Sequence, residues 1–317
     1  MEKWLITGAA GFLGSHVTEK LISEGKKVIA VDNLSWGHKS FIEERKNAMD
    51  FYQVDIRDKD ELDKIFEKHQ PTHVIHLAAL HFIPAAIKDP SLAIDINVRG
   101  TQNLLQSMRE KAHVKSFWFA STGDVYAPDE LPHHETKSVT SPFNIYGLTK
   151  FMCEQLINLE SKNAPDTKFV IGRLFNLYGA RETNPHIIPE ILNQIRKQTG
   201  DVQLSLGSIW PKRDMVPVDQ TADSIISTVK KLSEFQQNIF CMNYATGNVT
   251  SIEEMIKMIS KILNRKIQIN IDPAKVRGVE RSHLQADVGA LKAFLGKTPD
   301  PDLTIGLTKI LRDEQFI

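Results

Sequence analysis

The stretch Gly8-Ala9-Ala10-Gly11-Phe12-Leu13-Gly14 decides the fold of this 317-residue chain. It follows the apolar run 4–7 and opens into apolar positions at helical spacing, which Gly25 ends. Where a strand turns into a helix through glycines, backbone N–H groups and the helix N-terminus lie close to a bound phosphate, and no side chain blocks its approach. The stretch therefore predicts a pyrophosphate site for a dinucleotide, with contacts from Gly8, Gly11, Phe12, Leu13 and Gly14.

Short runs typical of β-strands alternate with helical patterns over the first half of the chain. The runs span residues 4–7, 28–31, 51–55, 73–77, 116–120 and 168–174. This alternation predicts an α/β fold with a Rossmann-type doubly wound parallel sheet. Prolines after Gly179 break the rhythm and predict a smaller C-terminal substrate-binding lobe. We expect a dinucleotide-binding domain of residues 1–179 and about 216–243, and a substrate-binding lobe of about 180–215 and 244–317.

The acid at the end of the second predicted strand selects the dinucleotide. Asp32 lies 24 residues past Gly8, where a carboxylate can accept hydrogen bonds from the adenosine ribose hydroxyls. A negative charge there repels a 2′-phosphate, so we expect NAD rather than NADP as the cofactor. The alternative is an ordinary strand-turn-helix with a solvated Asp32.

Composition and charge argue against several classes of partner. Lys and Arg number 39, as do Asp and Glu, so no net positive field attracts nucleic acid or an anionic membrane. No stretch approaches the roughly 20 apolar residues that span a bilayer, and the N-terminus does not resemble a signal peptide. Cys153 and Cys241 lack metal-ligand spacing, and the histidines form no HExxH pattern. We expect a cytoplasmic protein without a metal, a nucleic-acid partner or a membrane segment.

Six motifs carry a resemblance to a known family. In chain order they are TGAAGFLG (7–14), VDNLSWG (31–37), VDIRD (54–58), HLAA (76–79), NVRGT (97–101) and YGLTK (146–150). By their order and spacing, the chain resembles the extended short-chain dehydrogenase/reductases of the NAD-dependent nucleotide-sugar epimerase/dehydratase family, from residue 3 to about residue 313.

The resemblance implies cofactor contacts beyond the glycine stretch. These are Asp32, Asn33 and Ser35 at the adenosine ribose, Asp55 and Ile56 at the adenine, and Leu77, Ala78 and Ala79 at the nicotinamide ribose. His81 is also expected beside the cofactor, at a position where UDP-galactose 4-epimerases usually have lysine. This departure weakens an assignment to galactose.

Tyr146 and Lys150 are expected to carry the chemistry. They are four residues apart and so share one face of a helix, which Ser141 and Pro142 are expected to begin. The Lys150 cation favours tyrosinate and is expected to lower the pKa of Tyr146 from about 10. Tyr146 would take the proton of a sugar hydroxyl as hydride leaves for the nicotinamide, while Lys150 also binds the nicotinamide ribose. In the resemblance, Thr122 completes the triad and its hydroxyl holds the reacting oxygen.

The two residues after Thr122 separate the reaction types of the family. Nucleotide-sugar 4,6-dehydratases have Asp-Glu there and nucleotide-glucuronate decarboxylases have Ser-Glu, whereas this chain has Gly123 and Asp124. Gly123 has no proton to give, so dehydration loses its acid. Asp124 is expected to bind a sugar hydroxyl, although its carboxylate keeps a dehydratase or a decarboxylase open.

The intact triad favours an epimerase of the UDP-hexose 4-epimerase type, which passes through a transient 4-keto sugar. The alternative of another class is a non-catalytic, NAD-binding regulatory protein. Such proteins usually lose the tyrosine or the lysine, whereas this chain keeps both.

The resemblance also assigns the substrate side. In the segment 173–179, Phe175 is expected at the nicotinamide and Asn176 at the diphosphate of a nucleotide-sugar. Arg213 and Arg281 are expected to clamp the diphosphate, because a guanidinium makes paired hydrogen bonds to phosphate oxygens. The alternative for these arginines is surface ion pairs with neighbours such as Asp214 or Glu280. UDP is taken only from the frequency of uridine in relatives.

Two further expectations concern the surface. The loops 80–89, 128–141 and 181–189 are expected to build the sugar pocket. Helices near 91–110 and 143–161 are expected to form the four-helix interface of a homodimer, as in relatives.

Overall fold

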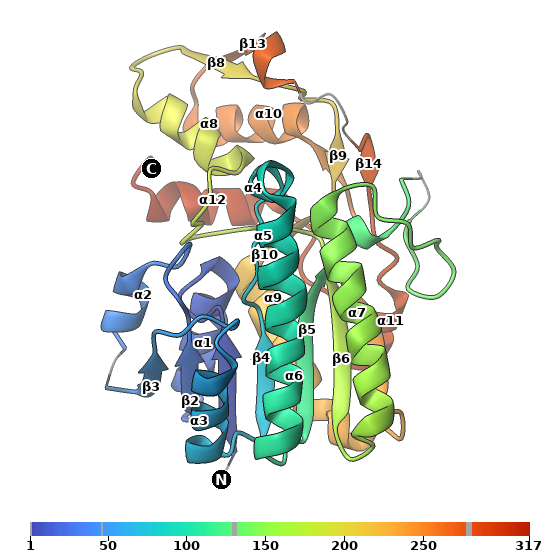
Figure 1. Cartoon of the computed structure of the whole chain (residues 1–317). Helices are drawn as coiled ribbons and strands as arrows, with labels where there is room; N and C mark the ends of the chain where they lie inside the picture. Colours follow the sequence, from blue (N-terminus) through green and yellow to red (C-terminus); the bar gives the residue numbers. More distant parts are fainter. Residues whose placement is uncertain (1, 46, 129–131, 277–280) are drawn as a thin grey trace.

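A parallel sheet of seven strands forms the centre of the molecule (Figure 1). The structure is a computed structural model, and it describes residues 2–45, 47–128, 132–276 and 281–317. From edge to edge the strands are β11 (Ile239–Tyr244), β6 (Lys168–Leu174), β5 (Ser116–Thr122), β4 (His73–His76), β1 (Lys3–Thr7), β2 (Lys27–Val31) and β3 (Met49–Tyr52). Each neighbouring pair is parallel. The predicted doubly wound α/β fold is confirmed.

The strand order reverses at β1, which lies between β2 and β4. In open α/β sheets, ligands bind at the carboxyl ends of the strands at such a switch point. The glycine stretch follows β1 directly, and the Leu77 N–H after β4 donates to the Thr7 carbonyl at 3.1 Å. The fold therefore places the glycine stretch beside residues 77–79.

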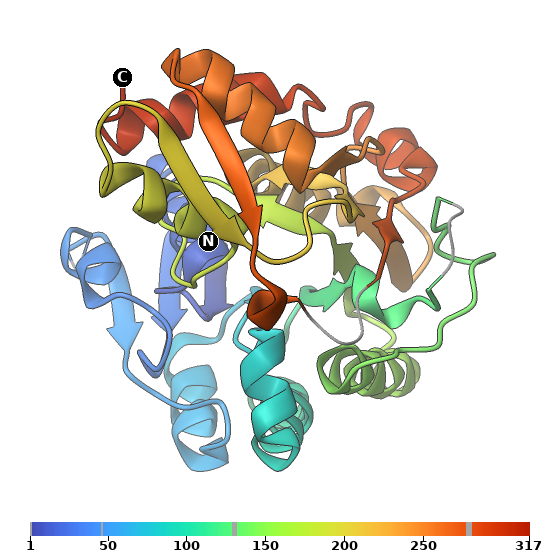
Figure 2. The same cartoon turned by 90° about the horizontal axis from the view of Figure 1, so that it is seen from above.

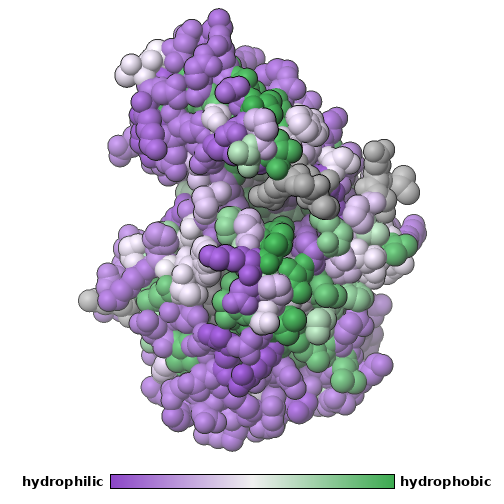
Figure 3. Space-filling view, turned by 45° about the horizontal axis from the view of Figure 1, so that its top comes forward, coloured by the Kyte–Doolittle hydropathy of each residue, from purple (hydrophilic) through white to green (hydrophobic). Residues whose placement is uncertain are grey.

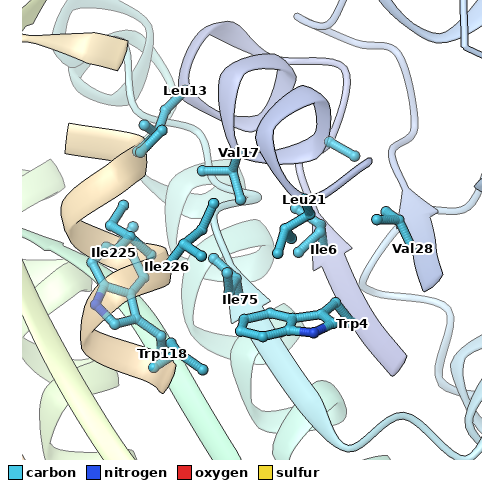
Figure 4. Close-up of a cluster of buried hydrophobic side chains, with 14 of the residues drawn as sticks. Trp4, Ile6, Leu13, Val17, Leu21, Val28, Ile75, Trp118, Ile225 and Ile226 are labelled. Carbon is cyan, nitrogen blue, oxygen red and sulfur yellow. The ribbon is translucent and has the colours of Figure 1, made fainter. Parts of the chain in front are cut away.

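Helices cover both faces of the sheet. One face packs against α1 (Phe12–Ser23), α9 (Val218–Lys231) and α11 (Gly289–Leu295), and the other against α3 (Lys59–His69), α6 (Gly100–Lys111) and α7 (Ile145–Asn163). Figure 4 shows the first of these cores, where Val17 and Leu21 of α1 and Ile226 of α9 lie over Trp4 and Trp118 of the sheet. Because the central strands β1, β4 and β5 are buried almost throughout, the sheet holds their carboxyl ends in place.

An upper lobe lies above the carboxyl ends of the strands (Figures 1 and 2). We define it by α8 (Ile187–Arg196), the parallel pair β8 (Val202–Leu206) and β13 (Ile267–Ile271), α10 (Ile252–Leu263) and α12 (Leu303–Asp313). These elements share one apolar core. The predicted domain boundaries stay a prediction, although α9 and β11 pack with the sheet rather than with this lobe.

The remaining elements of the described chain are shorter. They are the strands β7 (Asn176–Tyr178), β9 (Lys212–Arg213), β10 (Met215–Pro217), β12 (Thr250–Ser251) and β14 (His283–Leu284), the helices α2 (Lys39–Glu43), α4 (Ile83–Lys88) and α5 (Pro90–Ile94), a π-helix (Asp95–Arg99) and 3-10 turns at Gly123–Val125, Leu232–Glu234 and Pro273–Lys275. In the described part of the chain, no helix is both long enough and apolar enough to cross a membrane.

The predicted start of the catalytic helix is wrong. α7 begins at Ile145, and its N-cap is Asn144, whose side-chain oxygen accepts from the Gly147 N–H at 2.8 Å. Ser141 and Pro142 precede the helix in irregular backbone. Asparagine caps a helix as well as serine does, and the later start places Tyr146 in the first turn.

Two buried histidines of β4 make stability depend on pH. Burial lowers the pKa of His73 to about 4 and that of His76 to about 3. Between an unfolded value near 6.5 and these folded values, the unfolded chain binds more protons, so the free energy of unfolding falls as the pH falls. We expect a loss of up to about 1.4 kcal/mol per pH unit for each histidine.

Urea unfolding between pH 7 and pH 5 measures this loss. His76→Gln should flatten the dependence, because a glutamine amide can bond Thr7 and Thr101 without titrating. The exposed His113→Gln is the control and should leave it unchanged. An unaltered pH slope in His76→Gln would contradict the prediction.

Candidate active site

A cavity of about 1510 Å³ lies between the carboxyl ends of the strands and the upper lobe. Its walls include the residues after β1, β2, β4 and β5, together with residues of α8, α10 and α12. Every residue predicted to catalyse, to bind the cofactor or to bind the substrate lines this cavity. The structure thus brings all of them together, while their individual roles stay predictions.

The glycine stretch forms a cradle that side chains would fill. Gly8 has φ +71°, and a Cβ there would lie 2.7 Å from the Ala78 nitrogen. A Cβ on Gly14 would lie 1.9 Å from the Gly8 carbonyl oxygen. Gly11 is the N-cap of α1, so the helix N-terminus opens into the same cavity. This geometry fits the pyrophosphate of a dinucleotide.

Asp32 ties the cradle to the end of β2. Its carboxylate accepts from the Ala10 N–H at 2.9 Å and from the Leu34 N–H at 2.7 Å. Burial raises the pKa of Asp32, and these two backbone bonds oppose the rise. The carboxylate is held in place at the position where an adenosine ribose is expected.

Asp55 is fixed in the same way at the adenine side. Arg57 donates to both of its oxygens at 2.9 Å, and Asn33 donates to Oδ2 at 2.8 Å. The Arg57 hydrogen bonds lower the pKa of Asp55 to about 2. Asn33 and Asp55 are therefore one connected unit, while Ser35 and Ile56 line the cavity beside them.

Thr122, Tyr146 and Lys150 meet at the end of β5. The Thr122 side chain lies near the Tyr146 phenol and acts to lower its pKa. The Lys150 ammonium donates to the Ala120 carbonyl at 2.7 Å and lies 4.8 Å from the centre of the Phe119 ring. Burial lowers the pKa of Lys150 to about 8.

The predicted direction of the Tyr146 pKa shift is wrong for this structure. Burial raises the pKa of Tyr146, the Asp124 charge raises it further, and the Thr122 side chain opposes them. Lys150 points its ammonium at Ala120, so desolvation of the phenol outweighs any help from the cation. The sequence spacing predicted that the two residues share one helix face, but it does not report how deeply the phenol is buried.

Gly123 and Asp124 occupy a crowded turn. A Cβ on Gly123 would lie 3.2 Å from Cε1 and Cζ of Phe175, so a larger side chain requires Phe175 to move. The Asp124 N–H donates to the Thr122 hydroxyl at 3.2 Å, and its carboxylate acts electrostatically on Tyr146. Gly123 thus lacks the acid that a dehydratase has at this position, and the turn leaves little room for one. The Asp124 charge instead acts on Tyr146 of the triad.

The two arginines join the turn to the upper part of the cavity. Arg281, 5% exposed, donates to the carbonyls of Gly123 and Tyr126. Arg213 donates to the Arg281 carbonyl at 2.7 Å. The Asp214 carboxylate is instead bonded by Thr246 and Gly247. Glu280, the other alternative partner, lies outside the described residues.

Sequence reasoning missed a contact across the cavity. His81 accepts from the Asn184 amide at 2.8 Å, and burial lowers the pKa of His81 to about 4. Phe82 lies between the rings of Trp36, at 6.0 Å, and His186, at 5.9 Å. The signal available was weak: all of these residues except Trp36 fall in two loops expected to build the sugar pocket, and no spacing pairs them. Residues 129–131 of the third such loop lie outside the described residues.

A comparison with protein-family models supports the interpretation of this cavity as a cofactor site. The model of the NAD dependent epimerase/dehydratase family matches residues 4–241. The chain belongs to this family. The predicted family and the prediction of NAD as its cofactor are confirmed, and the glycine cradle with Asp32 and Asp55 fits that cofactor.

Relatives within the family are similar along nearly the whole chain. A UDP-glucose 4-epimerase of Rhizobium meliloti is 31% identical over 315 residues, which cover 94% of this chain and 93% of the relative. A UDP-glucuronate 4-epimerase of Thermodesulfobacterium geofontis is 29% identical over 320 residues, 98% of this chain and 95% of the relative. A crystal structure of a UDP-glucose 4-epimerase from Thermotoga maritima with UDP-glucose has a TM-score of 0.89 at 26% identity, covering 99% of this chain and 98% of that one.

Proposed function

We propose that this protein is an NAD-dependent UDP-hexose 4-epimerase. The observation that carries the proposal is the end of β5, where Thr122 lies near Tyr146 beside a buried Lys150, while Gly123 leaves no acid for dehydration. This is the minimal set for oxidising a sugar carbinol and reducing it again. The named relatives act on UDP-sugars at C4, which supports the nucleotide and the position.

The residues of the chain divide the work. Bound NAD supplies the acceptor and donor of hydride. Tyr146, in its tyrosinate form, takes the proton of the sugar 4-hydroxyl and returns it after reduction, and Thr122 holds the same oxygen. Lys150 holds a positive charge beside them and binds the nicotinamide ribose. The 4-keto sugar turns within the cavity between the two reductions.

We propose that the substrate residues keep their expected roles. Arg213 and Arg281 bind the diphosphate, Asn176 donates to it, and Asp124 bonds a sugar hydroxyl. Support comes from their shared position on the cavity wall. Because Arg281 bonds the Gly123 carbonyl, diphosphate binding would also steady the turn that follows Thr122.

Anomeric-proton NMR of the purified protein with single UDP-sugars tests the proposal. UDP-glucose, UDP-galactose, UDP-N-acetylglucosamine and UDP-glucuronate are incubated separately, and we expect at least one to equilibrate with its C4 epimer. No net NADH should accumulate, because hydride returns to the sugar. An unsaturated sugar, a decarboxylated sugar or stoichiometric NADH would instead support the dehydratase, decarboxylase or dehydrogenase alternatives.

We also propose a homodimer formed through α7 and its neighbours. Large apolar side chains are exposed on this side of the molecule: Ile87, Ile94, Leu148, Met152 and Leu159. Figure 3 shows hydrophobic side chains gathered on the surface below the upper lobe. Exposed apolar patches of this kind typically mark an interface.

Leu159→Glu tests the dimer, because a charge buried without a partner opposes association. We expect sedimentation velocity to show a shift from dimer to monomer. Ile305→Glu is the control, since Ile305 is similarly exposed, at 61% against 59%, but lies on α12. A wild-type protein that sediments as a monomer at micromolar concentration contradicts the proposal.

We also propose a cytoplasmic location. Cys153 and Cys241 are both free thiols, as is usual in a reducing compartment. Localisation of a fluorescent fusion tests it, and an extracytoplasmic signal would contradict it.

A further inference from the structure

A row of buried polar residues crosses three strands below the turn that follows Thr122. Ser121 of β5, Arg173 of β6 and Asn243 of β11 are register partners, so their side chains share one face of the sheet. They are 1%, 5% and 0% exposed, respectively. A guanidinium buried this deeply requires a partner.

Glu154 of α7 is that partner. Arg173 donates to its Oε1 at 3.0 Å and to its Oε2 at 2.7 Å, and the Ser121 hydroxyl donates to Oε1 at 2.5 Å. Glu154 itself is 2% exposed. Paired hydrogen bonds between a guanidinium and a carboxylate fix direction as well as distance. The contact therefore restrains both the rotation of α7 and its position along its axis.

Glu154 lies on the helix face that carries the chemistry. Tyr146, Lys150 and Glu154 follow one another at intervals of four residues. Three consecutive residues of β5 meet them: the Ala120 carbonyl accepts from Lys150, the Ser121 hydroxyl donates to Glu154, and the Thr122 side chain lies near Tyr146. Figure 1 shows α7 running along β5 and β6. Of these three contacts, the one at Glu154 is made by groups that touch neither the cofactor nor the sugar in the proposed mechanism.

The same arginine reaches the substrate side. Arg173 donates to the Glu135 carbonyl at 3.2 Å, and its guanidinium lies 4.7 Å from the centre of the Tyr126 ring. Tyr126 is also the residue whose carbonyl accepts from Arg281. A shift of Arg173 would thus affect the position of α7 and of the turn that follows Thr122.

We propose that Glu154 and Arg173, with Ser121, are positioning residues that set the place of the Tyr146 phenol over the end of β5. The proposal rests on the proposed function, because its main readout is turnover. A buried ion pair contributes little net stability compared with apolar side chains of similar size. We therefore attribute the Glu154–Arg173 pair to the position that it imposes on α7.

A second buried carboxylate on the same helix provides the control. Glu160 is 6% exposed and accepts from Arg109 at 2.6 Å, but it lies at the end of α7 away from the cavity. We compare Glu154→Gln with Glu160→Gln as holoproteins, at equal NAD content. We expect kcat to fall on the order of 10- to 100-fold in Glu154→Gln, as for a misplacement near 1 Å, with KM little changed. Glu160→Gln should retain wild-type kcat.

A milder pair of variants covers the case in which Glu154→Gln does not fold. Ser121→Ala removes one hydrogen bond and no charge, and Ser161→Ala removes a similarly buried hydroxyl from the far end of α7. We expect a several-fold lower kcat in Ser121→Ala alone, with Ser121→Thr restoring part of it. Equal losses in both members of either pair, or losses that follow the folded fraction, would show a purely structural role and overturn the proposal.

A titration separates this proposal from the proposed function. Tyrosinate absorbance, with each protein's Tyr146→Phe form as the blank, reports the pKa of Tyr146 without any sugar. Loosening α7 admits water to the buried phenol, so Ser121→Ala should bring the pKa of Tyr146 down toward its ordinary value of about 10, and Ser161→Ala should not. If the wild type epimerises no sugar, the proposed function fails while this shift still supports the positioning role. If the wild type epimerises and no shift or kcat loss occurs, only the positioning role fails.

Discussion

Tyr146→Phe should lower kcat by about 10²- to 10⁴-fold, the usual contribution of a general acid–base group. The Tyr146 oxygen, as tyrosinate, is the group that accepts and returns the sugar proton, and the phenyl ring of the variant can do neither. The ring itself still fills the buried site beside Thr122, so folding and NAD content should be unchanged. Turnover is measured by coupled assay or NMR on the substrate that the wild type converts.

The matched control for this variant is Tyr52→Phe. Tyr52 also loses a hydroxyl that is hydrogen-bonded, to His69 at 2.6 Å, but it lies in β3 and does not line the cavity. Its kcat should stay at the wild-type level. If Tyr146→Phe kept more than a tenth of wild-type kcat, another group would be the base. The view of the chain as a non-catalytic NAD-binding protein would gain if every assayable function survived the change.

Gly14→Ala should abolish stable NAD binding. The new methyl group would stand 1.9 Å from the Gly8 carbonyl oxygen, which belongs to the backbone and cannot swing aside. Either α1 or the turn at Gly8 must move, and the cradle for the pyrophosphate is lost with it. Overpacking of this kind costs about 1–3 kcal/mol of stability by itself. Nucleotide released on denaturation measures the NAD content, and thermal unfolding measures the stability.

Gly25→Ala separates loss of the cradle from ordinary strain. Gly25 follows the end of the same helix at φ +68°, and nothing lies within 4 Å of the position its Cβ would take. An alanine there is strained by about 1–2 kcal/mol, but the cradle is untouched. We therefore expect a lower Tm with full NAD content. Stoichiometric NAD in Gly14→Ala would refute the prediction.

Local sequence patterns were enough to predict the fold and the position of the site. The glycine stretch, Asp32 and the Tyr146–Lys150 spacing are short-range signals, because each needs only one turn or one helix face to be interpreted. The strands around them bury both faces and therefore read as short apolar runs. Family, fold and cofactor could be predicted from these features, and they are confirmed.

Features that depend on three-dimensional packing could not be predicted. Asn144 rather than Ser141 caps α7, since several residues before the helix were equally good caps. The pKa of Tyr146 moved opposite to expectation because burial, which spacing does not report, outweighs the cation. The His81–Asn184 bond joins residues 103 positions apart. Glu154 lies four residues after Lys150, on the same helix face as Tyr146, so its position could have been noticed. Its partners could not, because they come from two different strands, β5 and β6.

The late position of β11 in the chain has a consequence for biosynthesis. β6 is complete at Leu174, yet the strand that pairs with its outer side is not made until Tyr244. Until then a nascent chain carries an open, apolar sheet edge, the kind of surface on which chains aggregate. Truncation before residue 239 should thus yield insoluble material. The ribosome must deliver about three quarters of the polypeptide before this edge is sealed.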